Sequence, residues 1–135
     1  MVCATNGRGG WPHLMPLWYV LREPDDGGVG PRLWGWTYAK SQKARNLDRD
    51  PRATVELDSG VEYHELRGAM LECDVEVERD PERVADYGLA LADRYGGGAA
   101  AMREAFAAQA PKRVGLRFQP TRVVTWDHRK LAGSY

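Results

Sequence analysis

Alternation of apolar and polar residues predicts that most of this chain folds as β-strands. Apolar side chains alternate with Thr and Glu over residues 53–57, and with Glu and Asp over residues 71–78, which end a longer extended stretch, residues 63–78. This period of two is typical of strands with one face toward solvent. We therefore expect the acidic face of residues 71–78 to be a solvated surface. Further strands are predicted at residues 2–5, 11–21, 32–38, 113–119 and 121–126.

The first two predicted strands form a hairpin. Asn-Gly and Gly-Gly steps in residues 6–10 supply the positive φ values that a tight reversal needs. The returning strand, residues 11–21, is apolar on both faces, with Trp18 on one and Met15 on the other. We therefore expect it to be buried on both sides. Residues 23–31, rich in Gly, Pro and Asp, predict an exposed loop.

Capping signals and apolar spacing predict one short helix early in the chain and one helix or a pair of helices late in it. Ser41 is suited to cap a short helix that runs to about Arg49. Asp80, followed by Pro at the first helical position, marks the start of a second helix, whose apolar stripe continues to Tyr95. The Ala-rich residues 99–109 favour a further helix, with compositional bias as the alternative explanation. The predicted strands outnumber these helices.

Together these elements predict a mainly β fold with flanking α-helices. Recurrent hairpin signals favour an antiparallel barrel, which removes exposed sheet edges, with the helices packed outside it. A chain of 135 residues is sufficient for one core and one domain, residues 1–135.

Charge and composition exclude several classes of function. Lys plus Arg and Asp plus Glu each total 19, so no net field attracts the chain to nucleic acid or an anionic membrane. No apolar run approaches the roughly 20 residues that span a bilayer, and no signal peptide is evident, which predicts a cytoplasmic location. Cys3 and Cys73 are expected to be buried free thiols rather than a disulfide.

The junction between strand 32–38 and the short helix gathers side chains that can bind an anion. Its sequence, Thr37-Tyr38-Ala39-Lys40-Ser41-Gln42-Lys43-Ala44-Arg45-Asn46, brings hydroxyl, amide and cationic groups to a helix N-terminus, where unpaired N–H groups favour phosphate. Lys43 and Asn46 share a helix face, so Lys43 can supply a charged hydrogen bond and Asn46 and Ser41 neutral ones. The alternative is an ordinary solvated helix with a Ser cap.

Aromatic residues flank this junction. Trp18, Trp34 and Trp36 occupy the neighbouring strands with Tyr19 and Tyr38. Such rings can wall a planar ligand, and Trp36 is a candidate for that role. Core filling is the alternative explanation.

Other polar residues define no catalytic set. Arg67 is a candidate anion-binding residue and His64 a candidate proton donor, although an ion pair between Glu65 and Arg67 would also account for the pattern. We find no metal-ligand spacing and no nucleophile with a matching base. The segment after residue 122, with Trp126 and His128, could be a frayed end or could reach across a dimer interface.

Several motifs resemble the pyridoxamine 5'-phosphate oxidase-like family, and more closely its flavin- and deazaflavin-dependent oxidoreductase branch. The motifs are the opening strand pair with its Pro-His-Leu-Met-Pro-Leu-Trp core, Lys40-Ser41-Gln42-Lys43-Ala44-Arg45-Asn46-Leu47 followed by Asp50-Pro51-Arg52, Glu65-Leu66-Arg67-Gly68, and the closing Trp126-Asp127-His128 with Lys130-Leu131. They extend over nearly the whole chain.

The resemblance implies a split β-barrel of the FMN-binding type, a homodimer, and a coenzyme groove built by both subunits. By position, it assigns one group of residues to the coenzyme phosphate, a second group to the ring system, and one further residue to the site. These are Thr37, Ser41, Gln42, Lys43 and Asn46 at the phosphate, Met15, Pro16, Leu17 and Trp18 at the ring system, and Arg67.

The leading hypothesis is therefore an oxidoreductase that uses the deazaflavin coenzyme F420 to transfer hydride to a small unsaturated molecule. A composition typical of a GC-rich genome, together with Lys43 and Asn46, motivates it. FMN is the alternative coenzyme, because both carry a phosphate and a tricyclic ring. Gln42 stands where the vitamin oxidases carry Arg, which argues against pyridoxine-phosphate oxidation. A non-enzymatic flavin- or haem-binding split barrel is the alternative of a different class.

Overall fold

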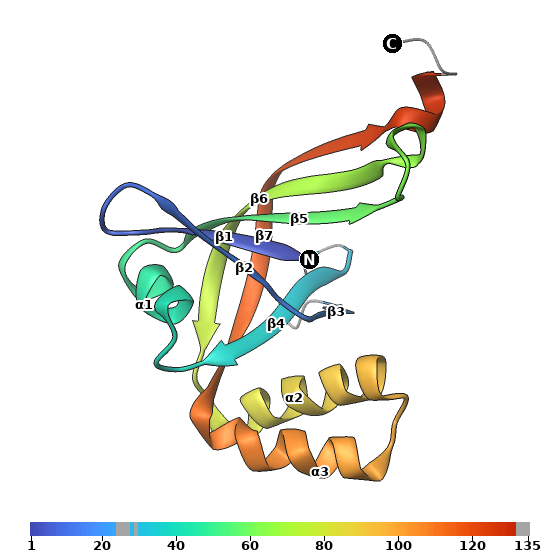
Figure 1. Ribbon diagram of the computed structural model, residues 1–135. Coiled ribbons are helices and arrows are strands. Elements are labelled where there is room, and N and C mark those ends of the chain that lie inside the picture. Colours follow the sequence, from blue (N-terminus) through green and yellow to red (C-terminus); the bar gives the residue numbers. More distant parts are fainter. Residues whose placement is uncertain (24–27, 29, 132–135) are drawn as a thin grey trace.

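A single curled antiparallel sheet with flanking helices forms the protein (Figure 1). The computed structural model describes residues 1–23, 28 and 30–131, and within them seven strands pair in the order β2-β1-β5-β6-β7-β4-β3. This is the predicted mainly β class, a half-barrel of the split-barrel type. The strands are β1 (Val2–Asn6), β2 (Pro12–Pro16), β3 (Tyr19–Arg22), β4 (Arg32–Tyr38), β5 (Arg52–Ser59), β6 (Arg67–Glu78) and β7 (Arg113–Asp127).

The early helix is α1 (Gln42–Arg49), and the late helical segment is a pair, α2 (Pro81–Gly96) and α3 (Ala100–Gln109). Ser41 caps α1 by accepting a hydrogen bond from Ala44 N at 3.1 Å. Asp80 caps α2, and its carboxylate accepts hydrogen bonds from two backbone N–H groups of the first turn. Gly97 follows α2 in the left-handed conformation, at φ 60°, as expected for a glycine that ends a helix.

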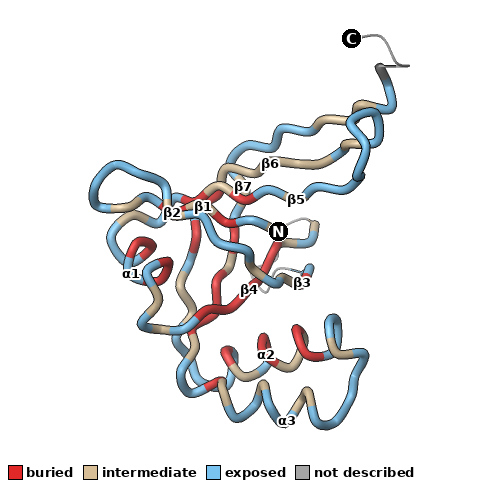
Figure 2. Tube along the Cα trace, viewed as in Figure 1, coloured by how far each residue is buried: buried red, intermediate tan, exposed pale blue. Residues whose placement is uncertain are grey.

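Two cores lie on opposite faces of the sheet. The first lies on the face that α1 covers, and includes Cys3, Val55 and Leu116, each with no exposed surface. The second lies under α2, where Trp34 and Trp36 of β4 pack against Tyr87. Figure 2 shows the buried segments concentrated in β4, α1 and the sheet-facing side of α2. The side chains of β4 therefore alternate between the two cores.

The sheet extends beyond both cores as an exposed arm. We define the arm as residues 56–59, 67–70 and 123–127, the outer parts of β5, β6 and β7. None of its residues is buried (Figure 2). Short 3-10 helices at Tyr63–Glu65 and His128–Leu131 close its tip.

The prediction of one strand at residues 11–21, buried on both sides, is wrong. Residues 12–16 pair with β1 and residues 19–22 with β4, so the segment forms two strands at opposite edges of the sheet. None of the five residues of β2 is buried. An edge strand lacks a neighbour on one side, and in β2 apolar side chains remain exposed.

Two smaller differences concern β6 and β7. Residues 113–127 form one strand, not two, because an irregularity between Glu72 and Cys73 accommodates the register around Pro120. Residues 63–65 form a 3-10 helix before β6 rather than part of that strand. The predicted loop at residues 23–31 falls largely outside the described residues.

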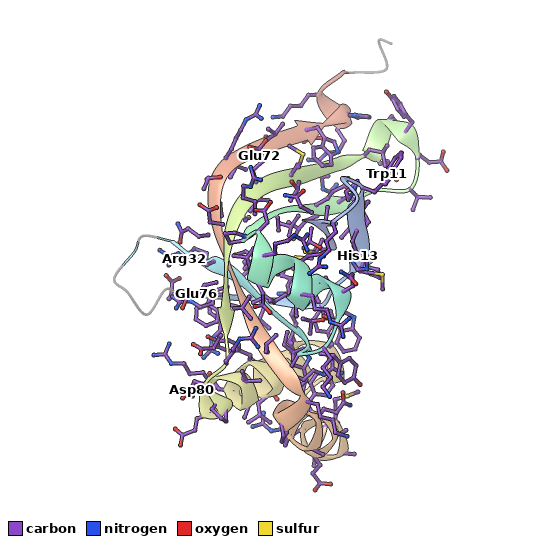
Figure 3. The ribbon with its side chains drawn as sticks, turned by 90° about the vertical axis from the view of Figure 1, so that its left-hand side faces the viewer. Trp11, His13, Arg32, Glu72, Glu76 and Asp80 are labelled. Atoms are coloured by element: carbon purple, nitrogen blue, oxygen red, sulfur yellow. The ribbon has the colours of Figure 1, made fainter. Side chains whose placement is uncertain are left out.

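The acidic face of β6 is paired rather than simply solvated. Glu72 lies 2.8 Å from Arg122, and Glu76 lies 3.1 Å from Arg117, both on the neighbouring strand β7. Figure 3 shows Glu72 and Glu76 along β6. Cys3 and Cys73 are buried free thiols, which confirms that prediction.

Candidate functional site

The turn from β4 into α1 places two hydroxyl groups beside an open helix end. The Thr37 hydroxyl donates to Ser41 Oγ at 3.2 Å, and the same oxygen accepts from Ala44 N. Ser41 Oγ thus acts as acceptor in both bonds, and its own O–H remains able to donate. The first-turn N–H groups of Gln42 and Lys43 have no acceptor within the helix. This end of α1 therefore presents several donors, as a phosphate group requires.

Lys43 is the most unusual residue of the site. Its side chain is only 4% exposed and lies beside Cys3 of β1. Burial lowers the pKa of Lys43 and raises the pKa of the Cys3 thiol to about 11. Within the described part of the chain, the Lys43 ammonium has no carboxylate partner and no hydrogen-bond acceptor. The ammonium nitrogen itself retains some exposed surface, so it is accessible from solvent.

Hydrogen bonds of Asn46 and Gln42 hold α1 against β1 of the sheet. Asn46 is fully buried, and its Nδ2 donates to Thr5 Oγ1 of β1 at 3.0 Å. Gln42 Nε2 donates to Asn46 Oδ1 at 2.8 Å. On β2, His13 pairs with Thr5, and its Nδ1 is buried without a partner among the described residues (Figure 3). Asn46 therefore holds the helix that carries Lys43.

Met15 and Leu17 lie on the α1 side of the sheet. Met15 pairs with Cys3 across β1 and β2, so the two side chains share a face, and Met15 is 46% exposed. Leu17 N donates to Met1 O at 2.9 Å, and Leu17 packs on Gly35, where a Cβ would lie 3.1 Å from its Cδ2. Pro16 pairs with Val2 and faces the opposite side. The structure thus brings Met15 near Lys43 but turns Pro16 away.

Trp18 and Trp36 stack on the hairpin formed by α2 and α3, and not on α1. Trp18 lies parallel to Tyr95 of α2 with ring centroids 4.4 Å apart, and 6.2 Å from Phe106 of α3. Trp36 stacks on the same Phe106 at 5.4 Å. Because side chains alternate along β4, Trp36 and Thr37 project to opposite faces of the sheet. These two indoles are therefore not brought together with Lys43.

Arg67 lies at the tip of the arm. Along β5, Ala53 pairs with Thr5 of β1, whereas Ser59 pairs with Arg67 of β6. These positions are six residues apart, which corresponds to roughly 20 Å along a strand. Within one chain, Arg67 is consequently remote from the Thr5–Asn46 contact and from α1.

Of the two histidines at the arm tip, His128 has structural contacts. His128 Nδ1 lies 2.9 Å from Tyr63 O, and the His128 ring contacts the Tyr63 ring. Glu65 accepts a hydrogen bond from Val61 N at 3.4 Å, within the same turn as His64. The described residues contain no group of His, Cys, Asp and Glu arranged to hold a metal ion. They also contain no helix long and apolar enough to cross a membrane.

Two further arginines lie at the α1 end of the molecule. Arg45 belongs to the junction and to the family motif but was assigned no role of its own, and Arg8 was not singled out from the sequence. Arg8, in the turn after β1, and Arg45, on the outer face of α1, line one surface cavity. Arg8 follows Asn-Gly in a turn and matched no motif. Only the folded chain shows that it lies near α1.

The sheet order, the α1 junction and the flanking hairpin define a split β-barrel protein. The chain belongs to the pyridoxamine 5'-phosphate oxidase family, because the family model described as "Pyridoxamine 5'-phosphate oxidase" matches residues 1–127. No curated protein matches the chain.

Solved structures share the fold. The conserved hypothetical protein Rv2991 from Mycobacterium tuberculosis is 37% identical, with a TM-score of 0.82 over 99% of this chain and 80% of that one. A structure named F420 reductase is 23% identical, with a TM-score of 0.69 over 91% of this chain and 86% of that one. HutZ, a heme storage protein from Vibrio cholerae, is 16% identical, with a TM-score of 0.67 over 91% of this chain and 82% of that one.

Proposed function

We propose that the protein is a homodimeric oxidoreductase that binds a phosphorylated flavin-type coenzyme, F420 or alternatively FMN, and reduces a small unsaturated substrate. The observation that carries the proposal is the Lys43 side chain, 4% exposed at the first turn of α1, whose ammonium reaches the surface without an acidic partner among the described residues. A buried cation without a counter-ion is costly, and an anionic ligand removes that cost.

A phosphate group suits the surroundings of Lys43. The Ser41 hydroxyl lies at the cap of α1, hydrogen-bonded to Thr37. The positive end of the helix dipole adds to the charge of Lys43. Lys43 would form the charged hydrogen bond and Ser41 a neutral one, with Thr37 orienting Ser41. Gln42 and Asn46 would support the site by holding α1 on β1.

The ring system would lie along the edge formed by β2 and the residues after it. Met15, exposed and on the same face as Cys3, offers an apolar contact there. The backbone at Pro16 and Leu17 continues this edge. Trp18 and Trp36 would act indirectly, by holding the α2–α3 hairpin against the sheet. Membership of the family and the F420 reductase neighbour support a flavin-type coenzyme.

The coenzyme supplies hydride chemistry, and the chain supplies binding and orientation. Lys43 and the first turn of α1 would anchor one end of the ligand, which fixes the distance from that anchor to the reacting ring. Apolar side chains such as Met15 and Leu17 would exclude water from the reacting face. No described side chain is required as an obligatory acid, so protonation from solvent completes the reduction.

A second copy of the chain is needed if Arg67 belongs to the same site. Arg67 is separated from the α1 end by roughly 20 Å of strand within one chain. The arm that carries it exposes apolar side chains, with Val123 55% and Val124 36% exposed. Pairing of two copies in a symmetric dimer would cover this arm and bring Arg67 of one subunit to Lys43 of the other.

Ligand binding tests the proposal. The purified protein is titrated separately with F420, FMN and haem, followed by fluorescence quenching and visible spectra. We expect a flavin-type coenzyme to bind, and Lys43→Ala to weaken it by about 1.5 to 3 kcal/mol, the range for a hydrogen bond to a charged group. Lys112→Ala, at an exposed lysine, is the control. Binding of haem alone, or an affinity unchanged by Lys43→Ala, contradicts the proposal.

Subunit mixing tests the shared site. Lys43→Ala and Arg67→Ala chains are unfolded together, refolded and assayed for coenzyme binding. In a mixed dimer one site keeps both native side chains, so random pairing restores about a quarter of the sites. At a coenzyme concentration near the wild-type Kd, each variant alone should bind far less coenzyme than this mixture. No recovery in the mixture means that Arg67 acts within its own subunit, and wild-type binding by Arg67→Ala alone means that Arg67 lies outside the site.

A further inference from the structure

A cavity of about 560 Å³ lies between the β1–β2 turn and the outer face of α1. It is lined by Arg8 from the turn and by Gln42, Arg45, Asp48 and Arg49 from the helix. Figure 1 shows the turn beside α1. Three arginines therefore converge on one small opening.

The positive charge of this cavity is not neutralised from within the described chain. Asp48, its one carboxylate, already lies 2.6 Å from Arg79. Arg49 donates to the backbone oxygen of Asn6. Arg8 and Arg45 have no acceptor and no ion pair among the described residues.

This lack of partners is unusual in a chain without net charge. Most other arginines of the described chain face a carboxylate within 4 Å. They are Arg22, Arg52, Arg79, Arg83, Arg103, Arg117, Arg122 and Arg129. Arg67 is a further arginine without a partner, but its cavity at the arm tip also contains the carboxylates of Asp58 and Asp127. The cavity beside α1 is the more strongly cationic of the two.

We propose that this cavity is an anion-binding site for phosphate or carboxylate groups, separate from Lys43. Residues 43 and 45 differ by about 200° around a helix, so the two side chains leave α1 on opposite sides. Lys43 is buried against β1, whereas Arg45 is exposed. Arg45 and Arg8 approach an anion from two elements, which allows charged hydrogen bonds from both.

The volume exceeds what one inorganic ion fills and is within the range of small-ligand sites. Two sources can provide the anion: carboxylates of the coenzyme that extend beyond its phosphate, or an independent polyanionic metabolite. The first source rests on the proposed function, and the second does not. Both would use Arg8 and Arg45.

The test uses calorimetric titration of the whole protein with citrate, F420 and FMN. F420 carries carboxylates beyond its phosphate, and FMN carries none. The double variant Arg8→Gln/Arg45→Gln is compared with the wild type and with Arg122→Gln, a control at an exposed arginine of β7. We expect the double variant to lose about tenfold or more in affinity for citrate, for F420 or for both, with Arg122→Gln unchanged.

The outcomes separate the two proposals. If the double variant loses affinity for F420 and keeps its affinity for FMN, the coenzyme is the source of the anion. If the double variant loses affinity for citrate alone, the anion is an independent metabolite. This result supports the site even if neither coenzyme binds the wild type. Lys43→Ala, which tests the proposed function, should leave citrate affinity unchanged. Equal affinities of wild type and double variant for citrate and F420 overturn the inference, whatever Lys43→Ala does.

Discussion

Asn46 of α1 donates a hydrogen bond to Thr5 of β1 at 3.0 Å, and both side chains are at most 1% exposed. Asn46→Ala leaves the Thr5 hydroxyl buried without its donor. We expect it to lower the free energy of unfolding by about 1 to 3 kcal/mol, the desolvation cost of an unpaired buried group. Urea denaturation measures the change.

The matched variant is Thr5→Val, which nearly preserves shape and removes the acceptor. In the double variant Asn46→Ala/Thr5→Val no unpaired hydroxyl remains. Its loss in the free energy of unfolding should therefore be smaller than the sum of the losses in the two single variants. Strict additivity would show that the two groups do not interact.

Lys43→Met tests the cost of burying an unpaired ammonium. The thioether side chain has a similar length and no charge, so in the ligand-free protein we expect a gain of about 1 to 2 kcal/mol in the free energy of unfolding. Thermal unfolding in a buffer without multivalent anions measures it. Lys112→Met, at an exposed lysine, should change nothing. A loss of stability in Lys43→Met would mean that the ammonium is already satisfied.

Gly88 lies where α2 closely approaches Trp36 of the sheet. A Cβ at this position would lie 2.5 Å from Trp36 Cζ3 and 2.7 Å from its Cη2. Alanine gains about 1 kcal/mol in helix propensity, but overpacking a buried indole costs about 1 to 3 kcal/mol. We expect Gly88→Ala to destabilise the protein in thermal unfolding. Trp36→Phe removes the clashing atoms, so adding Gly88→Ala to Trp36→Phe should be stabilising.

The buried thiols make stability fall at alkaline pH. Burial raises the pKa of Cys3 to about 11 and that of Cys73 to about 12, from 9.0. Above pH 9 the thiols of the unfolded chain ionise while those of the folded chain stay protonated. The contribution of each thiol to the free energy of unfolding is therefore full below pH 9 and is lost as pH rises toward 11. The lowered pKa of Lys43 acts in the opposite sense, since the unfolded chain keeps that proton longer.

The thiol effect is isolated by comparison with Cys3→Ala/Cys73→Ala. Between pH 9 and 11 the wild type should lose roughly 2 to 3 kcal/mol per thiol relative to this variant, as two pKa units imply. Urea denaturation at four pH values measures the difference. Parallel pH profiles for the two proteins would contradict the assigned cause.

Local patterns predicted the elements whose signals are local. The caps at Ser41 and Asp80 and the alternation in residues 71–78 depend on a few neighbouring residues, and all three predictions are confirmed. The mainly β class followed from the same signals and the split-barrel type from the family motifs, although the boundaries of β2, β3 and β7 did not.

Strand partners are not a local property, which explains the error at residues 11–21. An apolar run looks the same whether it lies inside a sheet or at its edge, and here it divides between both edges. The site residues show the same limit. Alternation placed Trp36 and Thr37 on opposite faces, but only the folded chain shows that α1 covers one face and the hairpin the other. Nothing in the pattern indicated that Lys43 would be buried beside Cys3.

Because β4 supplies alternate side chains to two separate cores, this protein contains two regions that can diverge independently. The α2–α3 hairpin depends on Trp34 and Trp36, whereas the end of α1 depends on Thr37 and the contacts to β1. The hydrogen bonds that hold α1 on β1 and Ser41 on Thr37 do not involve the hairpin. Homologues can therefore reshape one side of the sheet while inheriting the other intact.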